Sequence, residues 1–208
     1  VGRHAARFLG KPYEDCRLII MHGGGGVTAG AHAGGRVIDV NNGLDGDGPF
    51  SPQRSGGVPA GGLVRMCFSG KYTLPEMKLK LKGRGGLMAY TGTSDCQALE
   101  QYILTGEVKP RSGLDPLKVT REKAKEAMLA MAYQISKEIA ALSAVLEGKV
   151  DAIALTGGLA CSKMLVDEIK RRVGWIAQLL SYPGGDEMRA LRIAAETGLK
   201  HPKKVRIY

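Results

Sequence analysis

The chain has 208 residues, enough for one domain with a substantial core, and 44% of them are apolar. No apolar run approaches the roughly 18 residues that span a bilayer, and no signal peptide is recognisable, so neither a membrane protein nor a secreted one is expected. The formal net charge of +10 raises the possibility of an acidic partner, either nucleic acid or nucleotide phosphate. Lys and Arg are spread along the chain, which favours a solvated surface over a nucleic-acid-binding one.

The cysteines and histidines have no metal-ligand spacing, either within each set or between the two sets. We therefore interpret the cysteines as reduced thiols of a cytoplasmic protein; they are Cys16, Cys67, Cys96 and Cys161.

The stretch from Arg17 to His32 runs from an apolar strand through four consecutive glycines into a second strand. Glycines are kept where the backbone turns tightly or comes within hydrogen-bonding reach of a ligand, which is usually phosphate. The segments Val27–Ala33 and Arg36–Val40 are separated by two more glycines and predict a hairpin. No helix and no Lys-Ser/Thr pair follows the run, so a dinucleotide site and a P-loop are excluded, while a plain turn between strands stays possible.

Two short helices are predicted next. Apolar residues between Gly57 and Ser69 have helical spacing, and Thr73 followed by Glu76 has the spacing of a capping box. Three lysines in the second helix alternate with apolar residues, a pattern that could also indicate an edge strand or a nucleic-acid-binding stripe. The cap and the helical spacing favour a solvated helix face for them, at Lys78, Lys80 and Lys82.

The segment 85–95 carries flanking glycines and leads into a helix up to Ile103, with Thr93 or Ser94 as the expected N-cap. The longest regular pattern runs from Thr120 to Glu147 and predicts a helix with one buried face. Its apolar positions recur at three- and four-residue steps: Ala124, Met128, Met131, Ile135, Ile139, Leu142 and Val145.

A buried strand then ends in the pair Gly157-Gly158, which is followed by a predicted helix from Ser162 to Val173. Paired glycines after a strand form a turn more often than a site, although the helix start here offers unpaired backbone N–H groups to an anion. A strand from Ile176 to Tyr182 and a final helix complete the chain. These elements predict a mixed α/β sheet flanked by helices, of the ribonuclease H-like type.

Four runs of the sequence resemble runs of the acetate kinase family, in its butyrate kinase branch. The run 22–32 is similar to the family's His-Leu-Gly-Gly-Gly-Ile-Ser-Val-Gly-Ala-His, and the run 48–56 to its Gly-Pro-Phe-Ser-Pro-Glu-Arg-Ser-Gly. The run 86–97 resembles Gly-Leu-x-Ala-Tyr-x-Gly-Thr-Asn-Asp-Ala-Arg near the nucleotide, with Gln97 in place of the arginine. The run 182–188 resembles Tyr-Pro-Gly-Glu-Asp-Glu-Met. The resemblance extends over almost the whole chain.

The resemblance implies an actin-like ATPase fold and a kinase that exchanges a phosphoryl group between ATP and the carboxylate of butyrate, giving an acyl phosphate and ADP. Members of the family are about twice as long and consist of two duplicated actin-like domains. This chain does not begin with Met, and its first nine residues look like the end of a basic helix. Residues 1–208 are therefore expected to form a single C-terminal domain, with the N-terminal domain missing.

The resemblance also implies roles for particular residues. Arg54 would clamp the substrate carboxylate or the transferring phosphoryl group with its fork of donors. His22 would contact the phosphoryl group or the β/γ-phosphates, although a histidine at a strand end outside this context is more often structural. The N–H groups of Gly24, Gly25 and Gly26 would assist it. The nucleotide would be bordered by Asp95, Gly157, Gly158 and Leu159, and Glu187 would hold Mg²⁺ directly or through water.

Other functions stay open on the sequence alone. The chain could be a truncated ATP-binding domain without turnover, or a kinase that prefers acetate or a branched-chain fatty acid. A basic nucleic-acid-binding module is a remote alternative that rests on charge alone. We expect a short-chain carboxylic acid as substrate and a homo-oligomer, with no membrane and no nucleic-acid partner.

Overall fold

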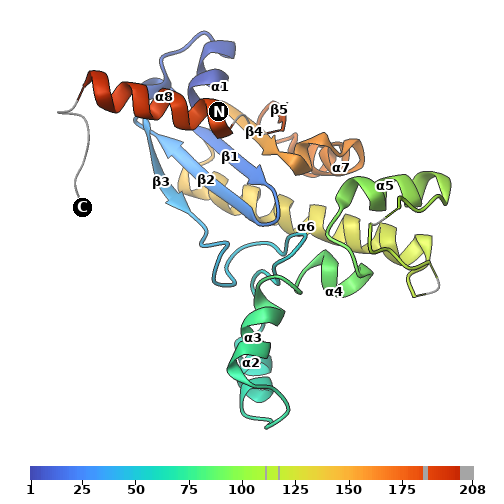
Figure 1. Cartoon of the computed structure of the whole chain (residues 1–208). Helices are drawn as coiled ribbons and strands as arrows, with labels where there is room; N and C mark the ends of the chain where they lie inside the picture. The colour runs from blue at the N-terminus through green and yellow to red at the C-terminus, as the bar shows by residue number, and fades with distance from the viewer. Residues whose placement is uncertain (111, 117, 185–186, 202–208) are drawn as a thin grey trace.

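The fold is built on a five-stranded mixed sheet with the strand order β3-β2-β1-β4-β5 (Figure 1). The structure is a computed structural model and describes residues 1–110, 112–116, 118–184 and 187–201, without the side chains of 187, 189 and 190. Neighbouring strands pair antiparallel from β3 to β1 and parallel from β1 to β5, which confirms the predicted mixed sheet. The strands are β1 (Leu18–Gly23), β2 (Val27–Ala33), β3 (Arg36–Val40), β4 (Ala152–Gly157) and β5 (Leu179–Pro183).

The two central strands, β1 and β4, are parallel and packed on both faces. All six residues of β4 are buried, and β1 is buried except for the half-buried Ile20 and for His22, which is exposed near the carboxyl end. Continuous apolar sequence is typical of strands that are covered on both sides. The exposed histidine therefore marks the end of the sheet at which the packing opens.

One face of the sheet is covered by α6 (Arg121–Val145), which crosses behind the strands in Figure 1. The helix begins where the predicted pattern begins, because the Thr120 hydroxyl accepts a hydrogen bond from the Lys123 N–H (3.4 Å). Six of the seven predicted apolar positions are buried, and Val145 in the last turn is exposed. α6 also packs against α5 (Cys96–Thr105) and α7 (Lys163–Val173), the predicted helices on either side of it in sequence.

The opposite face carries α1 (Gly2–Phe8) and the short 3₁₀ helix η1 (Tyr13–Asp15). Ala5 and Ala6 of α1 form a second small core with the buried Leu18 and Leu180. The predicted helix at the start of the chain is thus confirmed, and it packs as part of this domain.

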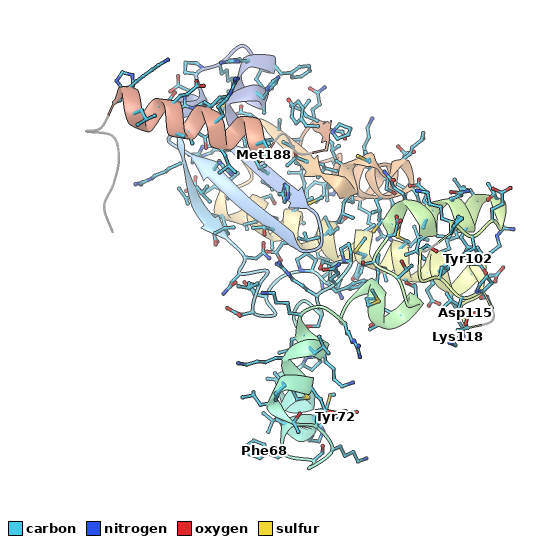
Figure 2. The ribbon with its side chains drawn as sticks, in the orientation of Figure 1. Phe68, Tyr72, Tyr102, Asp115, Lys118 and Met188 are labelled. Atoms are coloured by element: carbon cyan, nitrogen blue, oxygen red, sulfur yellow. The ribbon has the colours of Figure 1, made fainter. Side chains whose placement is uncertain are left out.

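The helices α2 (Ala60–Cys67) and α3 (Leu74–Leu81) form a hairpin that projects away from the sheet (Figure 1). Both were predicted, and α3 begins with the predicted capping box, in which the Glu76 carboxylate accepts from the Thr73 N–H (2.7 Å). The apolar spacing that predicted α2 covers no core, since no residue of α2 is buried. Phe68, labelled in Figure 2 at the tip of the hairpin, is 87% exposed.

A short helix, α4 (Leu87–Thr91), precedes α5, and the predicted N-cap of α5 is wrong. Asp95, rather than Thr93 or Ser94, caps α5, and its carboxylate accepts a hydrogen bond from the Ala98 N–H (2.9 Å). Three good capping residues stand in a row here, and the path of the chain out of α4 decides which one is used.

The last helix, α8 (Glu187–Lys200), presents exposed apolar side chains, among them Met188 (Figure 2).

The cysteines are free thiols; Cys16 and Cys96 are buried, and Cys67 and Cys161 are exposed. Within the described part of the chain, no helix combines the length and the apolar character of a membrane span. The same residues contain no group of three or more metal-binding side chains.

Asp151 ties the N-terminal segment to the start of β4. Its carboxylate accepts hydrogen bonds from the Arg17 N–H (2.8 Å) and from the Lys11 ammonium (2.5 Å). Burial alone would raise the pKa of Asp151, but the bonds from Lys11 and Arg17 outweigh it and lower the pKa below the ordinary value of 3.8. This ionised carboxylate therefore contributes to the stability of the fold at neutral pH.

We expect Asp151→Asn to lower the free energy of unfolding by about 1 kcal/mol at neutral pH, because the ion pair with Lys11 is lost. A lowered folded-state pKa gives stability that is present above the unfolded pKa and is lost as the pH falls through the folded pKa. The difference between the parent and the variant should therefore shrink on acidification, as measured by urea unfolding along a pH series. A difference that stays constant down to acid pH would contradict this account.

Candidate functional site

The four-glycine run forms the tight connection between β1 and β2. Gly23 pairs with Val27, so the loop itself consists of Gly24, Gly25 and Gly26. The Gly24 N–H donates to the Gly26 carbonyl (2.8 Å) and closes the loop. The sequence assigned the N–H groups of all three glycines to phosphate, and in this structure the Gly24 N–H is used inside the loop.

A second turn, formed by residues 51–54, is fixed onto this loop. The Gly25 carbonyl accepts two hydrogen bonds from it, one from the Ser51 hydroxyl (2.8 Å) and one from the Gln53 N–H (3.1 Å). The Ser51 N–H donates to the Arg54 carbonyl (3.0 Å), which closes the turn on itself. Ser51 is buried, so these bonds are shielded from water. The two glycine- and proline-rich motifs of the sequence therefore form one unit.

At each glycine of the loop, a polar side chain of the same site lies beside the position that a Cβ would take. A Cβ placed on Gly26 would lie 2.3 Å from Nη1 of Arg54, and one placed on Gly25 would lie 3.2 Å from Oε1 of Gln53. A Cβ on Gly24 would lie 3.7 Å from Nε2 of His22. His22, Gln53 and Arg54 are thus held beside the loop, and the space is tight at Gly25 and Gly26.

Arg54 has a structural partner within the fold. Its Nη1 donates to the Gly43 carbonyl (2.8 Å), and the side chain is half-buried against Gly26. A guanidinium has five N–H donors, so one bond to a carbonyl leaves most of the fork for an anion. The Gly43 bond fixes the direction in which that fork points.

His22 lies at the carboxyl end of β1, between Thr28 of β2 and Thr156 of β4 in the pairing register. Its ring lies beside two glycines, since Cε1 is 3.0 Å from the Cβ position of Gly157 and Nε2 is near that of Gly24. The side chain is exposed, as a group that acts on a ligand must be. The structure therefore brings the Gly157 turn, which is far away in the sequence, beside His22 and the glycine loop.

The three residues from Gly157 to Leu159 differ in their roles. Gly157 has a φ of +85°, and a Cβ there would lie 2.4 Å from the Gly23 carbonyl oxygen. Leu159, in the short 3₁₀ helix η2 (Gly158–Cys161), is buried beneath Gly23. Gly158 alone has no atom within 4 Å of its Cβ position. Gly157 and Leu159 thus hold the junction between β1 and β4, and Gly158 presents open backbone.

These segments surround a cleft of about 260 Å³. Gly24, Gly25 and Gln53 form one side of it, Gly158 and Leu159 another, and the start of α5 with Asp95 a third. Arg54 and His22 do not line this volume; they lie on the other sides of the same glycine loop. The side formed by α5 is anchored to α7, because the Glu100 carboxylate accepts from the Met164 N–H (2.8 Å).

Among the side chains that the structure describes, Asp95 is the only carboxylate that lines the cleft, and its helix-capping bond directs it toward α5. Cys96 beside it is a buried thiol whose pKa is raised to about 12 by burial first and by the charges of Asp95 and Glu100 second. A thiol with so high a pKa is protonated at neutral pH and is not a nucleophile. Cys96 therefore supplies no nucleophile to the cleft.

The metal-binding role of Glu187 cannot be compared with side-chain geometry, because that side chain lies outside the described residues. Gln97, which stands where the similar family run has an arginine, does line the cleft. It supplies an amide at the start of α5 but no positive charge.

A profile of the acetate kinase family, described as the Acetokinase family, matches residues 1–173. Over 205 residues, which is 98% of this chain, the sequence is 53% identical to the probable butyrate kinase of Elusimicrobium minutum (strain Pei191). The chain belongs to the acetate kinase family. It covers 55% of that relative, so it spans about half the length of the protein that it matches.

Solved structures of acetate and propionate kinases share the fold, as the sequence predicted. The acetate kinase of Porphyromonas gingivalis matches 94% of this chain with a TM-score of 0.77 at 21% identity, and 52% of its own chain is covered. The propionate kinase of Francisella tularensis subsp. tularensis SCHU S4 matches 90% of this chain with a TM-score of 0.73 at 18% identity, with 50% of its own chain covered. The expected actin-like ATPase fold of this acetate kinase family member is thereby confirmed.

Two residues of the site, Gln53 and Ser94, were not predicted from the sequence. The Gln53 side chain amide donates to the Ser94 hydroxyl (3.2 Å) and joins the turn before Arg54 to the start of α5. The available signal was position, since Gln53 directly precedes the arginine and Ser94 directly precedes Asp95. Neither residue type is diagnostic by itself, so the pairing becomes visible only in three dimensions.

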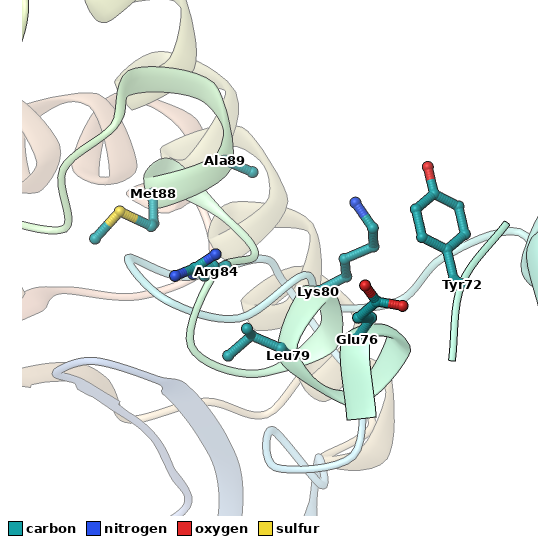
Figure 3. Close-up of a pocket in the computed structure, with 7 residues that line it drawn as sticks. All are labelled: Tyr72, Glu76, Leu79, Lys80, Arg84, Met88 and Ala89. Carbon is teal, nitrogen blue, oxygen red and sulfur yellow. The ribbon is translucent and has the colours of Figure 1, made fainter. Parts of the chain in front are cut away.

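A larger cavity of this acetate kinase family member lies elsewhere, between α3 and α4, and has a volume of about 520 Å³ (Figure 3). Two of its charged groups are already engaged: the Glu76 carboxylate holds the α3 cap, and the Lys80 ammonium lies 4.6 Å from the centre of the Tyr72 ring. None of the predicted site residues lines this cavity. Size alone therefore does not locate the site.

The close packing at the glycines can be tested by measuring the stability of variants. We expect Gly26→Ala to change the free energy of unfolding by less than about 1 kcal/mol, because the added Cβ meets only the flexible end of Arg54, which can move away. We expect Gly157→Ala to cost about 2 kcal/mol or more, because its φ is positive and the Cβ meets rigid backbone. Urea unfolding measures both.

A control shows whether Gly26→Ala really displaces Arg54. Arg54→Ala should lower stability in the parent but should have a smaller effect in the Gly26→Ala background, where the bond to Gly43 is already lost. Equal effects of Arg54→Ala in both backgrounds would show that Gly26→Ala does not displace Arg54 from its bond to Gly43.

Proposed function

We propose that this chain is the nucleotide-binding half of a butyrate kinase, which transfers a phosphoryl group between ATP and the carboxylate of butyrate or a related short-chain fatty acid. The observation that carries the proposal is the convergence of His22 and Arg54 on one glycine loop beside the open backbone of Gly158. The 53% identity to a probable butyrate kinase favours butyrate among the carboxylates.

Phosphoryl transfer requires little covalent chemistry from the protein. A carboxylate oxygen forms a bond to the γ-phosphorus while the bond from that phosphorus to the bridging oxygen breaks, and ADP leaves with the electron pair. Because a carboxylic acid is ionised at neutral pH, no proton has to be removed from the acceptor. The protein must instead position the reactants and stabilise the charge that spreads over the phosphoryl oxygens.

The residues on the glycine loop fit this task. Arg54 is held by its bond to Gly43 with most of its donors left for an anion, so it can bind the carboxylate or the phosphoryl oxygens bidentately. His22 lies at the open end of β1 and can contact the same group from the side of Gly157. Neither role needs a proton transfer, which agrees with a reaction that moves none.

The nucleotide fits the cleft between the loop, η2 and α5. Gly158 leaves open space for a flat or charged ligand, and the start of α5 offers backbone N–H groups together with Asp95. A cleft of about 260 Å³ is somewhat smaller than the ~300–1,000 Å³ of typical small-molecule sites. We infer that a further N-terminal domain, for which the greater length of the matched relative leaves room, supplies the opposing wall.

Mg²⁺ in such reactions is bound by one or two carboxylates together with the phosphates, and it keeps several waters. The described residues contain no preformed cluster of carboxylates, which fits an ion that arrives with ATP. We propose Glu187 as its direct or water-mediated ligand.

We further propose that the protein is cytoplasmic and that it forms a homo-oligomer. The exposed apolar side chains of the α2–α3 hairpin are candidate contacts between its subunits.

The test compares this chain with a longer protein that carries the proposed N-terminal domain in front of it. We expect the chain alone to bind MgATP weakly and to form no acyl phosphate detectable as the hydroxamate, because each missing contact to the developing charge costs about 10²- to 10³-fold in rate. The longer protein should form butyryl phosphate readily. If the longer protein binds nucleotide but forms no acyl phosphate, the protein is an ATP-binding domain without turnover and the proposal is overturned. If it prefers acetate or a branched-chain acid, the proposed reaction stands but the proposed substrate is wrong.

A matched pair of variants locates the nucleotide. Gly158→Val places a side chain in the open space of the cleft and should weaken MgATP binding strongly with little change in melting temperature. Gly62→Val on α2 is the control, because its Cβ position also has no atom within 4 Å but lies away from the cleft. Calorimetric affinities that are equal for the two variants would show that the nucleotide binds elsewhere.

A further inference from the structure

Gln53 is fixed in the cleft by its backbone on both sides. Its N–H donates to the Gly25 carbonyl (3.1 Å), and its own carbonyl accepts from the Gly83 N–H (2.7 Å). With both peptide groups held, the direction in which the side chain leaves the backbone is determined. That direction leads into the volume between the glycine loop and α5.

The side chain then spans the cleft from one wall to the other. Its Oε1 rests on Gly25, 3.2 Å from the Cβ position, and its Nε2 donates to the Ser94 hydroxyl (3.2 Å). Ser94 directly precedes Asp95, the N-cap of α5, so the amide reaches the end of the helix at which an anion is favoured. Despite these contacts, Gln53 is exposed to solvent.

The chemistry of the amide suits a phosphate. An amide nitrogen carries two N–H donors, and the bond to Ser94 occupies one of them. The second can reach a ligand in the cleft, where Asp95 is the only carboxylate among the described lining residues and Gln53 adds no negative charge. A neutral donor held rigidly in place binds an anion without the cost of ordering a flexible side chain.

We propose that Gln53 is a nucleotide-positioning residue, which holds the wall at Ser94 against the glycine loop and donates its remaining N–H to a phosphate of the bound nucleotide. This inference rests on the proposed function, because it places the nucleotide phosphates beside Gly25. It also gives Ser94 a defined role, since the serine acts on the nucleotide only by orienting the amide.

The test measures the affinity of the chain for MgADP and for adenosine. Gln53→Met keeps the length of the side chain and removes its donors, so MgADP binding should weaken about tenfold while adenosine binding and the melting temperature stay unchanged. Ser94→Ala should weaken MgADP binding less, because the amide remains. The double variant should bind MgADP like Gln53→Met alone, because Ser94 acts through Gln53.

The outcomes separate this inference from the proposed function. MgADP affinity that is unchanged in Gln53→Met, equal losses for MgADP and adenosine, or additive losses in the double variant would each overturn the role of Gln53 and leave the kinase proposal standing. The predicted losses together with no acyl phosphate from the longer protein would support Gln53 and overturn the kinase. A parent chain that does not bind MgADP at all would overturn both.

Discussion

The site depends on the docking of the 51–54 turn onto the glycine loop between β1 and β2. Two hydrogen bonds to the Gly25 carbonyl, from the Ser51 hydroxyl and the Gln53 N–H, make the docking specific. The absence of side chains on the loop makes it possible, because the arginine and the glutamine of the turn occupy the space that those side chains would take. An added side chain at Gly25 or Gly26 would therefore have to displace the glutamine or the arginine of the turn.

Because the surrounding structure is firmly packed, the polar and charged groups around the glycine loop are held in fixed positions. β1 and β4 are buried central strands, so the ends from which His22 and Gly158 emerge are held by the core beneath them. Arg54 is oriented by its bond to the Gly43 carbonyl, and the α5 wall is held through Glu100 at the start of α7. Donors that are already oriented need no reorganisation when charge develops, which is the main source of electrostatic catalysis. Under the proposed function, the contacts that stabilise this part of the fold would also orient the groups that bind the substrates.

Local patterns in the sequence predicted most of the elements, because hydrophobic periodicity and caps act over a few residues. The hairpin 27–40, the long helix α6 and the strand before Gly157 all follow from such patterns. The partners of the glycines could not be predicted, since Gly26 and Arg54 meet through a turn whose path depends on the whole fold. The cap of α5 was misassigned for a related reason: three suitable residues compete, and tertiary structure selects Asp95. The exposure of α2 likewise depends on what surrounds a helix and not on its own spacing.

The most direct test of this account follows the histidine rings by NMR while MgADP is added to the ¹⁵N-labelled chain. His22 lies on the glycine loop, whereas His32 is half-buried and bonded to the Tyr13 hydroxyl (2.7 Å) on the far part of the hairpin. The account predicts that the ring signals of His22 shift on binding and that those of His32 stay in place. Saturation with MgADP that leaves His22 unchanged, or that shifts both rings equally, would contradict the claim that the glycine loop is the phosphate site.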